Sequence, residues 1–268
     1  TATITQSSNS NKVIEVFQSG MTSAAGGEEL RRNTLSITQQ GGNGNVIETV
    51  VQKRTRSALD IFGLTDGQSG NEATIVQDGT GNRVGLLSQT GRSNNAYLSF
   101  DGNRNDARSI QSGAGNDAYV DVTGSWNFIR IDQESLVLGN EATIRIVGGN
   151  ANFARVSQSG SNEALITIEG NANAVSLDQS GSNEAAVSVE GHFNFVAASQ
   201  AGVGNSIDVT VRGHGNNAPW LGGFSAPPKT TFLTHGEPQA ADALRLRIEQ
   251  ELGWRVHVPE HNETVRLQ

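Results

Sequence analysis

Residues 162–200 read NEALITIEGNANAVSLDQSGSNEAAVSVEGHFNFVAASQ. Within this stretch the motif NEA, first seen at 162–164, returns 21 residues later at 183–185. Self-similarity at a fixed period of this size is the signature of repeat architectures, in which each unit stacks on the next. The fold therefore depends on how far the repeat extends and on which of its positions face inward.

The repeat can be followed through a series of asparagines whose spacing runs from ten to thirteen residues. They are Asn105, Asn116, Asn127, Asn140, Asn152, Asn162, Asn173, Asn183, Asn194 and Asn205. Positions two, four and six residues after each asparagine are never charged, whereas the positions between them hold many acids and bases. This alternation predicts short β-strands with one dry face and one wet face. A helix would mix the two sets, because its period is 3.6 residues.

The sixth position after each asparagine carries a further signal, because glutamine and an aliphatic residue alternate there. The repeating unit is therefore about 22 residues long and contains two unlike strands joined by Gly/Asn/Ser turns. If each unit forms one rung of a solenoid, like residues stack at about 4.8 Å and buried amides can bond along the stack. We expect ladders of Gln111, Gln133, Gln158, Gln179 and Gln200 and of Asn116, Asn140, Asn162, Asn183 and Asn205. The predicted fold class is all-β, a cross-β solenoid.

The predicted solenoid covers residues 1–217, because the same two-strand pattern returns at 2–18 and 35–52. Charged or irregular segments near 21–32 and 53–67 interrupt it, and we expect both to loop out of the stack. After Asn217 the repeat stops. Residues 218–268 predict a small β-α-β module with strands at TTFL (230–233) and WRVHV (254–258) and a helix over 239–252.

Composition excludes several classes of protein. The chain has no cysteine, so neither a disulfide framework nor thiolate chemistry is available. Its formal net charge of −8 argues against a protein that coats nucleic acid. No apolar run approaches the roughly 18 residues of a membrane span, so we expect no membrane insertion. Thr1 lies directly in repeat-like sequence, which is compatible with a secretion signal removed before this numbering.

The repeat resembles the curlin repeat of bacterial curli fibre subunits, most clearly in LSITQQGGNGN (35–45), QSGAGNDAYVDV (111–122) and QSGSNEALITI (158–168). The resemblance implies a protein secreted to the bacterial cell surface and extracellular matrix. There it would polymerise head to tail into amyloid fibres of the biofilm, with curli-type secretion and nucleation proteins as partners. This chain has more rungs and two inserts. The roles of major subunit, nucleator and surface adhesin all stay open.

The tail resembles the C-terminal segment of the β-CASP branch of metallo-β-lactamase-fold ribonucleases, through HGE (235–237) and GW-x-V-x-VP (253–259). The resemblance makes His235 the one position that corresponds to a zinc ligand of that family. The HxHxDH cluster is absent from this sequence, and a catalytic zinc needs about three protein ligands. His257 and His261 lie four residues apart on or beside the last strand. We therefore expect no metal, no cofactor and no catalytic residue.

Two surface patterns each admit two interpretations. Asp117, Glu141, Glu163 and Glu184 recur one residue after their asparagines, so they can hold a cation such as Ca²⁺ or form a solvated negative stripe, partly offset by Arg145 and Arg155. Phe128, Phe153 and Phe195 share that position on the glutamine strands and should form an outward aromatic ladder. Such a ladder can make a lateral contact or simply stabilise the stack.

These observations favour a structural protein and not an enzyme: a subunit of extracellular fibres that serve adhesion and biofilm formation. An alternative is a monomeric, capped solenoid that acts as a surface adhesin or binds polysaccharide. Prolines 219, 227 and 228 favour a cap, because proline cannot donate to a strand ladder. A weaker alternative is a nuclease-related tail that binds RNA.

Overall fold

The computed structural model describes residues 1–19, 32–54, 70–136, 138–213, 215, 217–219, 231–232, 242, 245–246, 249–250 and 255–258. It falls into two compact units, Thr1–Trp220 and Leu221–Gln268. The first unit is a parallel β-solenoid, as the sequence predicts, and helix is almost absent from the described residues. The core of the predicted inserts, at 20–31 and 55–69, lies outside the described residues.

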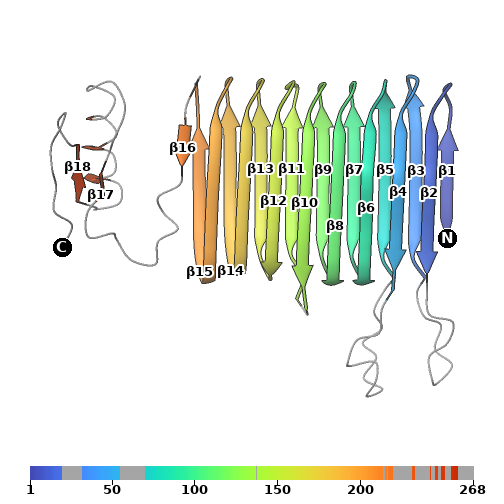
Figure 1. Cartoon of the computed structure of the whole chain (residues 1–268), viewed down its shortest axis with the longest axis horizontal. Coiled ribbons are helices and arrows are strands. Elements are labelled where there is room, and N and C mark those ends of the chain that lie inside the picture. Colours follow the sequence, from blue (N-terminus) through green and yellow to red (C-terminus); the bar gives the residue numbers. More distant parts are fainter. Residues whose placement is uncertain are drawn as a thin grey trace, which may run out of the picture. The chain divides into compact units, whose positions relative to one another are not determined.

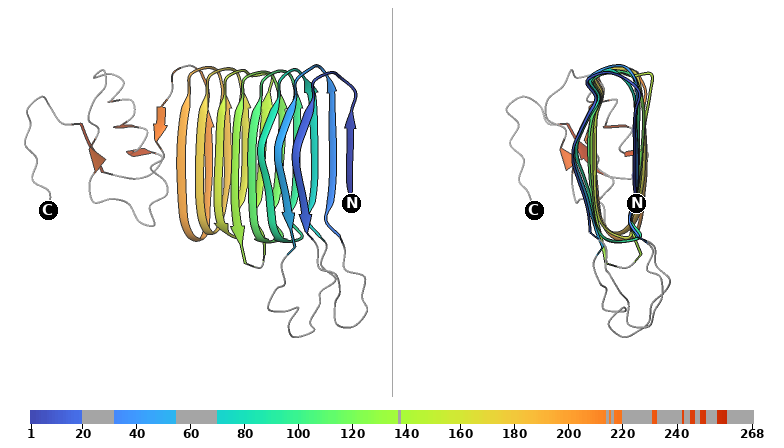
Figure 2. Two further views of the ribbon diagram at one scale, coloured as in Figure 1. Left: turned by 45° about the vertical axis from the view of Figure 1, so that its right-hand side comes forward. Right: turned by 90° about the vertical axis from the view of Figure 1, so that its right-hand side faces the viewer.

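The solenoid has two walls of parallel strands that face each other across the core (Figures 1 and 2). The odd wall consists of β1 (Ala2–Gln6), β3 (Thr34–Gly41), β5 (Glu72–Gly79), β7 (Asn95–Asp101), β9 (Asp117–Thr123), β11 (Glu141–Val147) and β13 (Glu163–Glu169). The even wall consists of β2 (Lys12–Ser19), β4 (Val46–Lys53), β6 (Arg83–Arg92), β8 (Asp106–Ala114), β10 (Phe128–Ser135) and β12 (Phe153–Gly160). Seen end-on, successive rungs superpose into one flattened loop (Figure 2).

Two long strands, β14 (Ala174–Glu190) and β15 (Phe195–Val211), pass through a corner and belong to both walls. The first part of β14 pairs with β12 and its second part with β13, so one strand closes the loop. The sequence predicts a tight reversal at SGSN (180–183). Instead the chain stays hydrogen-bonded to β15 there, with a register shift between Ser182 and Glu184. The stack allows this because each corner residue has a neighbour one rung away.

Alternating burial places the core between the walls. Along β11 the residues alternate between exposed or half-buried and fully buried, and Ala142, Ile144 and Ile146 are at most 1% exposed. Ile144 lies in register with Val120 on one side and Ile166 on the other. Because the side chains at one position are stacked on similar ones, a thin core of Ala, Val, Ile and Leu is packed along the whole solenoid.

Glycine at the corner is required by close approach as well as by backbone conformation. Gly181 has a φ of 105°, and a Cβ there would collide with the carbonyl of Gly202 on the next rung. Residues other than glycine rarely adopt such a φ. Glycine recurs in this column at Gly91, Gly113, Gly160, Gly181 and Gly202, and the rung between Gly113 and Gly160 carries the small residue Ser135.

The second unit contains β17 (Thr231–Phe232) and β18 (Val256–His257), which pair in parallel. Residues 242, 245–246 and 249–250, between these strands, are helical. A parallel pair needs a crossover connection, so the described part of the tail has the predicted β-α-β order. The short strand β16 (Asn217–Pro219) belongs to the first unit and pairs with β15 at Phe195–Ala197.

Candidate functional site: side-chain ladders and solenoid faces

A continuous glutamine ladder runs inside the even wall. The Nε2 of Gln133 donates to the Oε1 of Gln158 at 3.0 Å, and Gln158 donates to Gln179 at the same distance. Gln111 donates to Gln133 at 3.0 Å and Gln179 donates to Gln200 at 2.8 Å. The five predicted glutamines therefore form one column, in which every amide points the same way. The ladder extends backward through Gln18, Gln52 and Gln89.

The same amides also satisfy backbone groups of the opposite wall. Gln133, only 2% exposed, donates to the carbonyl of Asp117 at 2.8 Å as well as to Gln158. A buried amide without hydrogen-bond partners lowers the free energy of unfolding by about 1–3 kcal/mol. Because each glutamine bonds to its neighbour and to the far wall, the column joins the two walls while it joins the rungs.

The predicted asparagine ladder is also present, and it runs in the opposite sense. The Nδ2 and the backbone N–H of Asn162 both donate to the Oδ1 of Asn140, each at 3.0 Å. Asn140 donates to Asn116, Asn183 to Asn162 and Asn205 to Asn183 in the same manner. Here each later rung donates to the earlier one, whereas along the glutamine column each earlier rung donates to the later one.

Two further ladders accompany these. A second glutamine column, from Gln6 through Gln39 to Gln77, lines the odd wall with amide distances of 2.6 and 2.7 Å. It ends where Phe100 is in register with Gln77, and aliphatic residues follow. The repeated segments TITQ (3–6), SITQ (36–39) and TIVQ (74–77) carry the signal for it. A further inward asparagine column contains Asn82, Asn105, Asn127, Asn152, Asn173 and Asn194.

The corner between odd and even strands holds a column of left-handed residues. Gly44 and Gly81 take this conformation at φ 73° and 69°, and Arg104, Trp126 and Phe193 take it at 56°, 63° and 58°. For large side chains this region costs about 1–2 kcal/mol relative to a right-handed conformation. Arg104 lies over the Trp126 ring, 4.5 Å from its centroid, and Trp126 is 59% exposed.

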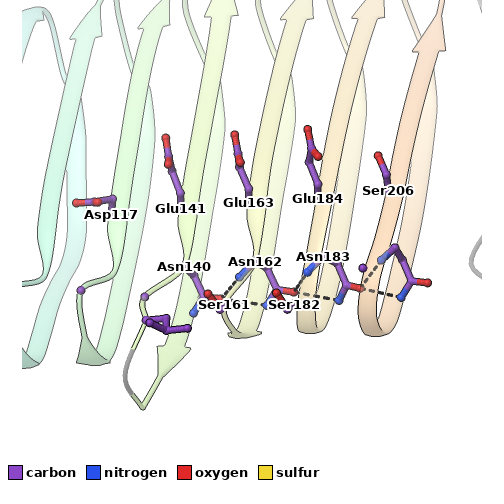
Figure 3. Close-up of a pocket in the computed structure, with 15 residues that line it drawn as sticks. Asp117, Asn140, Glu141, Ser161, Asn162, Glu163, Ser182, Asn183, Glu184 and Ser206 are labelled. Atoms are coloured by element: carbon purple, nitrogen blue, oxygen red, sulfur yellow. Dashed lines mark hydrogen bonds between the residues drawn. The ribbon is translucent and has the colours of Figure 1, made fainter.

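The four acids form one outward column on the odd wall, in register on neighbouring strands (Figure 3). A shallow groove of about 440 Å³ lies beside them, bordered by the corner asparagines and small residues. Partial burial raises the pKa of Asp117, and a hydrogen bond from Asn95 lowers it by less. Among the described residues, no three His, Asp or Glu side chains lie close enough to hold a metal ion.

The predicted three-phenylalanine ladder is wrong in part. Phe128 and Phe153 stack with centroids 5.6 Å apart and planes 5° from parallel. Ala174 lies between Phe153 and Phe195 in the register, so Phe195 shares the column but has no aromatic neighbour on that side. Beside the column, Arg108, Arg130 and Arg155 occupy consecutive strands of the even wall.

Little of the tail's predicted site can be placed. His235 and His261 lie outside the described residues, and His257 ends β18. The described tail residues therefore do not supply a zinc ligand set.

Comparison with known protein families agrees with both parts of this description. The model of the curlin associated repeat matches residues 102–134 and 149–181. The model of the Zn-dependent metallo-hydrolase RNA specificity domain matches residues 219–259. Searches of curated proteins and of solved structures found no match. No helix in the described residues is long and apolar enough to cross a membrane.

The first unit is thus a parallel β-solenoid in which residues 102–134 and 149–181 match the curlin associated repeat, and the segment at 219–259 is similar to the metallo-hydrolase RNA specificity domain. Repeats and fold together indicate a curli-like structural or surface protein.

Proposed function

We propose that this protein is a secreted subunit that assembles end to end into curli-like extracellular fibres, which serve adhesion and the biofilm matrix. The observation that carries the proposal is the direction of the amide ladders. Gln200, at the far end of the column, has a side-chain N–H with no later glutamine to receive it in the described residues. Gln18, at the near end, donates to Gln52, and no hydrogen bond to its Oε1 occurs within the described part of the chain.

The two ends of the stack are therefore complementary. A second copy placed on β15, with its β2 taking the place of β16 at Phe195–Ala197, would offer the Gln18 oxygen where Gln200 needs an acceptor, and the ladder would continue across the joint. The core supports the same contact. Ile4 is 46% exposed, while its in-register neighbour Ile37 is 1% exposed, so the first rung presents core surface to solvent. Head-to-tail contact of this kind does not close and gives a filament.

Strand edges support this assembly. On the outer side of β15 only Phe195–Ala197 are paired among the described residues, through β16. The rest of β15 there offers a row of peptide groups, which is a template for another strand. A structural role of this kind needs no catalytic residue.

A monomeric, capped solenoid that binds a surface or polysaccharide is the second candidate, and β16 favours it. This strand lies on part of β15 and ends at Pro219, which has no N–H for the next strand. The match of the tail to an RNA specificity domain supports the weaker alternative of RNA binding. A gel-shift titration of the full chain with single-stranded RNA tests it, and no shift at micromolar protein would dismiss it.

The main proposal is tested by substitution at the first rung of the full chain. Ile4→Asp places a charge in the end core and should lengthen the thioflavin-T lag and shorten the fibres. Ile14→Asp is the matched control, because Ile14 is 66% exposed on the same rung and has no register partner in the core. Equal kinetics for both variants, or no fibres from the wild-type chain, would reject end-to-end assembly.

A further inference from the structure

The two outer faces of the solenoid differ in the charges that they stack. The odd wall carries the acidic column, which we define as Asp117, Glu141, Glu163 and Glu184. The even wall carries the arginine column, defined as Arg108, Arg130 and Arg155. Like charges on adjacent strands repel each other, so each column has unfavourable energy that an opposite column would relieve.

The charges of the arginine column are only partly neutralised from within the chain. Arg130 pairs with Asp132 on its own strand at 2.6 Å, and Arg155 pairs with Asp178 at 2.7 Å. Arg108 has no ion pair with the described residues, and its Nε is buried without a hydrogen-bond partner. Among the described residues the column therefore retains one positive charge without an ion pair, at Arg108, beside an exposed apolar surface.

An exposed aromatic surface lies beside the arginines. Phe128 and Phe153 are 41% and 36% exposed and stack on each other. Trp126, two residues before Phe128, lies at the corner in a left-handed conformation, in a column where glycine occurs on earlier rungs. A strained backbone at an exposed tryptophan, together with a pair of exposed phenylalanines on the next strand, is a combination found at contact surfaces.

The acidic column is built to the same spacing. Both columns rise by one strand per rung, about 4.8 Å, because both belong to one in-register parallel stack. Figure 3 shows the side chains of Glu141, Glu163 and Glu184 pointing the same way, with Asp117 turned to the side, and all four line the groove. Two rigid arrays with equal spacing can match charge with charge over several rungs, which irregular surfaces cannot do.

We propose that the acidic column of one copy binds the arginine column and its aromatic flank on a second copy, so that solenoids associate side by side. The two columns lie on opposite walls, so each copy presents both partners and a layer can extend in either direction. This contact is separate from the end-to-end joint and does not depend on it. Exposed charge contacts are screened by salt, so the association weakens as ionic strength rises.

The test uses two charge-reversed forms of the full chain, R130E/R155E and E163K/E184K. In either form alone, the two columns carry charges of the same sign and repel each other. The protein concentration for half-complete lateral association, measured by sedimentation velocity, should therefore rise about tenfold or more. Fibres seen by electron microscopy should be narrower. An equimolar mixture should restore association, because the reversed faces then complement each other. The control E169K/E190K changes the same charges on the same two strands outside the column. It removes one ion pair, between Glu190 and Arg212 at 3.9 Å, which is exposed and therefore weak, so lateral association should match that of the wild type.

Thioflavin-T kinetics report the end-to-end joint separately, and circular dichroism reports folding. If a reversed form does not fold, R130Q/R155Q replaces it and should show a smaller loss. The proposal is overturned if the wild-type chain shows no lateral association at low salt, if reversal leaves it unchanged, or if two folded reversed forms fail to associate when mixed.

Discussion

Gln133 donates to Gln158 at 3.0 Å, while Asn162, four residues after Gln158, donates to Asn140 on the preceding rung. Within one stack, therefore, two buried amide columns run in opposite directions. Each rung therefore both donates to and accepts from each neighbour: its glutamine accepts from the earlier rung and donates to the later one, and its asparagine does the reverse. This arrangement makes the rungs directional and gives the stack two different ends.

Interrupting the glutamine column should destabilise the solenoid. Gln133→Leu removes the acceptor for Gln111 and the donor for Gln158, and each lost partner costs up to about 1–3 kcal/mol. We expect the lower end of that range per partner, because Gln111 keeps its bonds to the carbonyls of Asn95 and Asn116. Urea unfolding followed by circular dichroism measures the change. Ser159→Ala, at an exposed position of β12, is the control and should change the free energy of unfolding by less than about 0.5 kcal/mol.

Alanine substitutions at two glycines distinguish the energetic cost of a close contact from the cost of backbone strain. Gly148 has a φ of 67° with open space around its Cβ position, so Gly148→Ala should cost about 1–2 kcal/mol from conformation alone. Gly181→Ala adds the collision with the Gly202 carbonyl and should cost clearly more. Thermal unfolding of both variants compares them. Equal losses would mean that the corner spacing is wider than described.

Two carboxylates should show opposite pH dependence. Burial raises the pKa of Asp117 in the folded state, so the folded chain holds that proton more tightly and loses stability as pH rises through the folded pKa. Asp117→Asn should therefore stabilise the protein at neutral pH, and the gain should vanish once pH falls below the pKa of the unfolded state.

Glu48 provides the contrast, because the hydrogen bond from Arg83 lowers its pKa. The stability that this pair contributes is present above the unfolded pKa and is lost as pH falls through the folded pKa. Glu48→Gln should destabilise at neutral pH and have little effect in acid. Urea midpoints measured from neutral to acid pH decide both cases, and a shared sign for the two variants would contradict the assignment.

The coupling energy between aromatic residues of the Phe128 column should differ from one pair to the next. Phe153→Ala removes the stack with Phe128, and a double-mutant cycle on the pair should give a coupling of about 0.5–1.5 kcal/mol. The same cycle on Phe153 and Phe195 should give a value near zero, because Ala174 separates them. A coupling between Phe153 and Phe195 as large as the first would mean that the register differs.

The sequence predicted the stack, its inward positions and the five-glutamine ladder. The period-two alternation shows which residues face inward, and the recurring asparagine shows where each repeat begins. It led to a wrong aromatic ladder because Phe153 and Phe195 are two repeats apart, and the rung between them carries Ala174. The left-handed conformations of Arg104 and Trp126 could not be predicted, since those residue types do not favour it. Only their equivalence with Gly81 and Gly44 in the stack reveals it.

The alignment of the arginines follows the same asparagine phase as the ladders. Arg108, Arg130 and Arg155 each lie three residues after an asparagine of the series, and their strands pair without a register shift. The phase does not show which arginines are neutralised, because that depends on side-chain contacts: Arg130 pairs with Asp132 on its own strand and Arg155 with Asp178 on the next even-wall strand.

An experimental structure of the assembled chain, by cryo-electron microscopy at side-chain resolution, tests the stacked-amide account most directly. The account requires Gln133, Gln158, Gln179 and Gln200 in one interior column, with side-chain nitrogen–oxygen distances near 3 Å, about the usual hydrogen-bond length. A density map that placed any of these side chains in solvent, or their strands out of register, would contradict it.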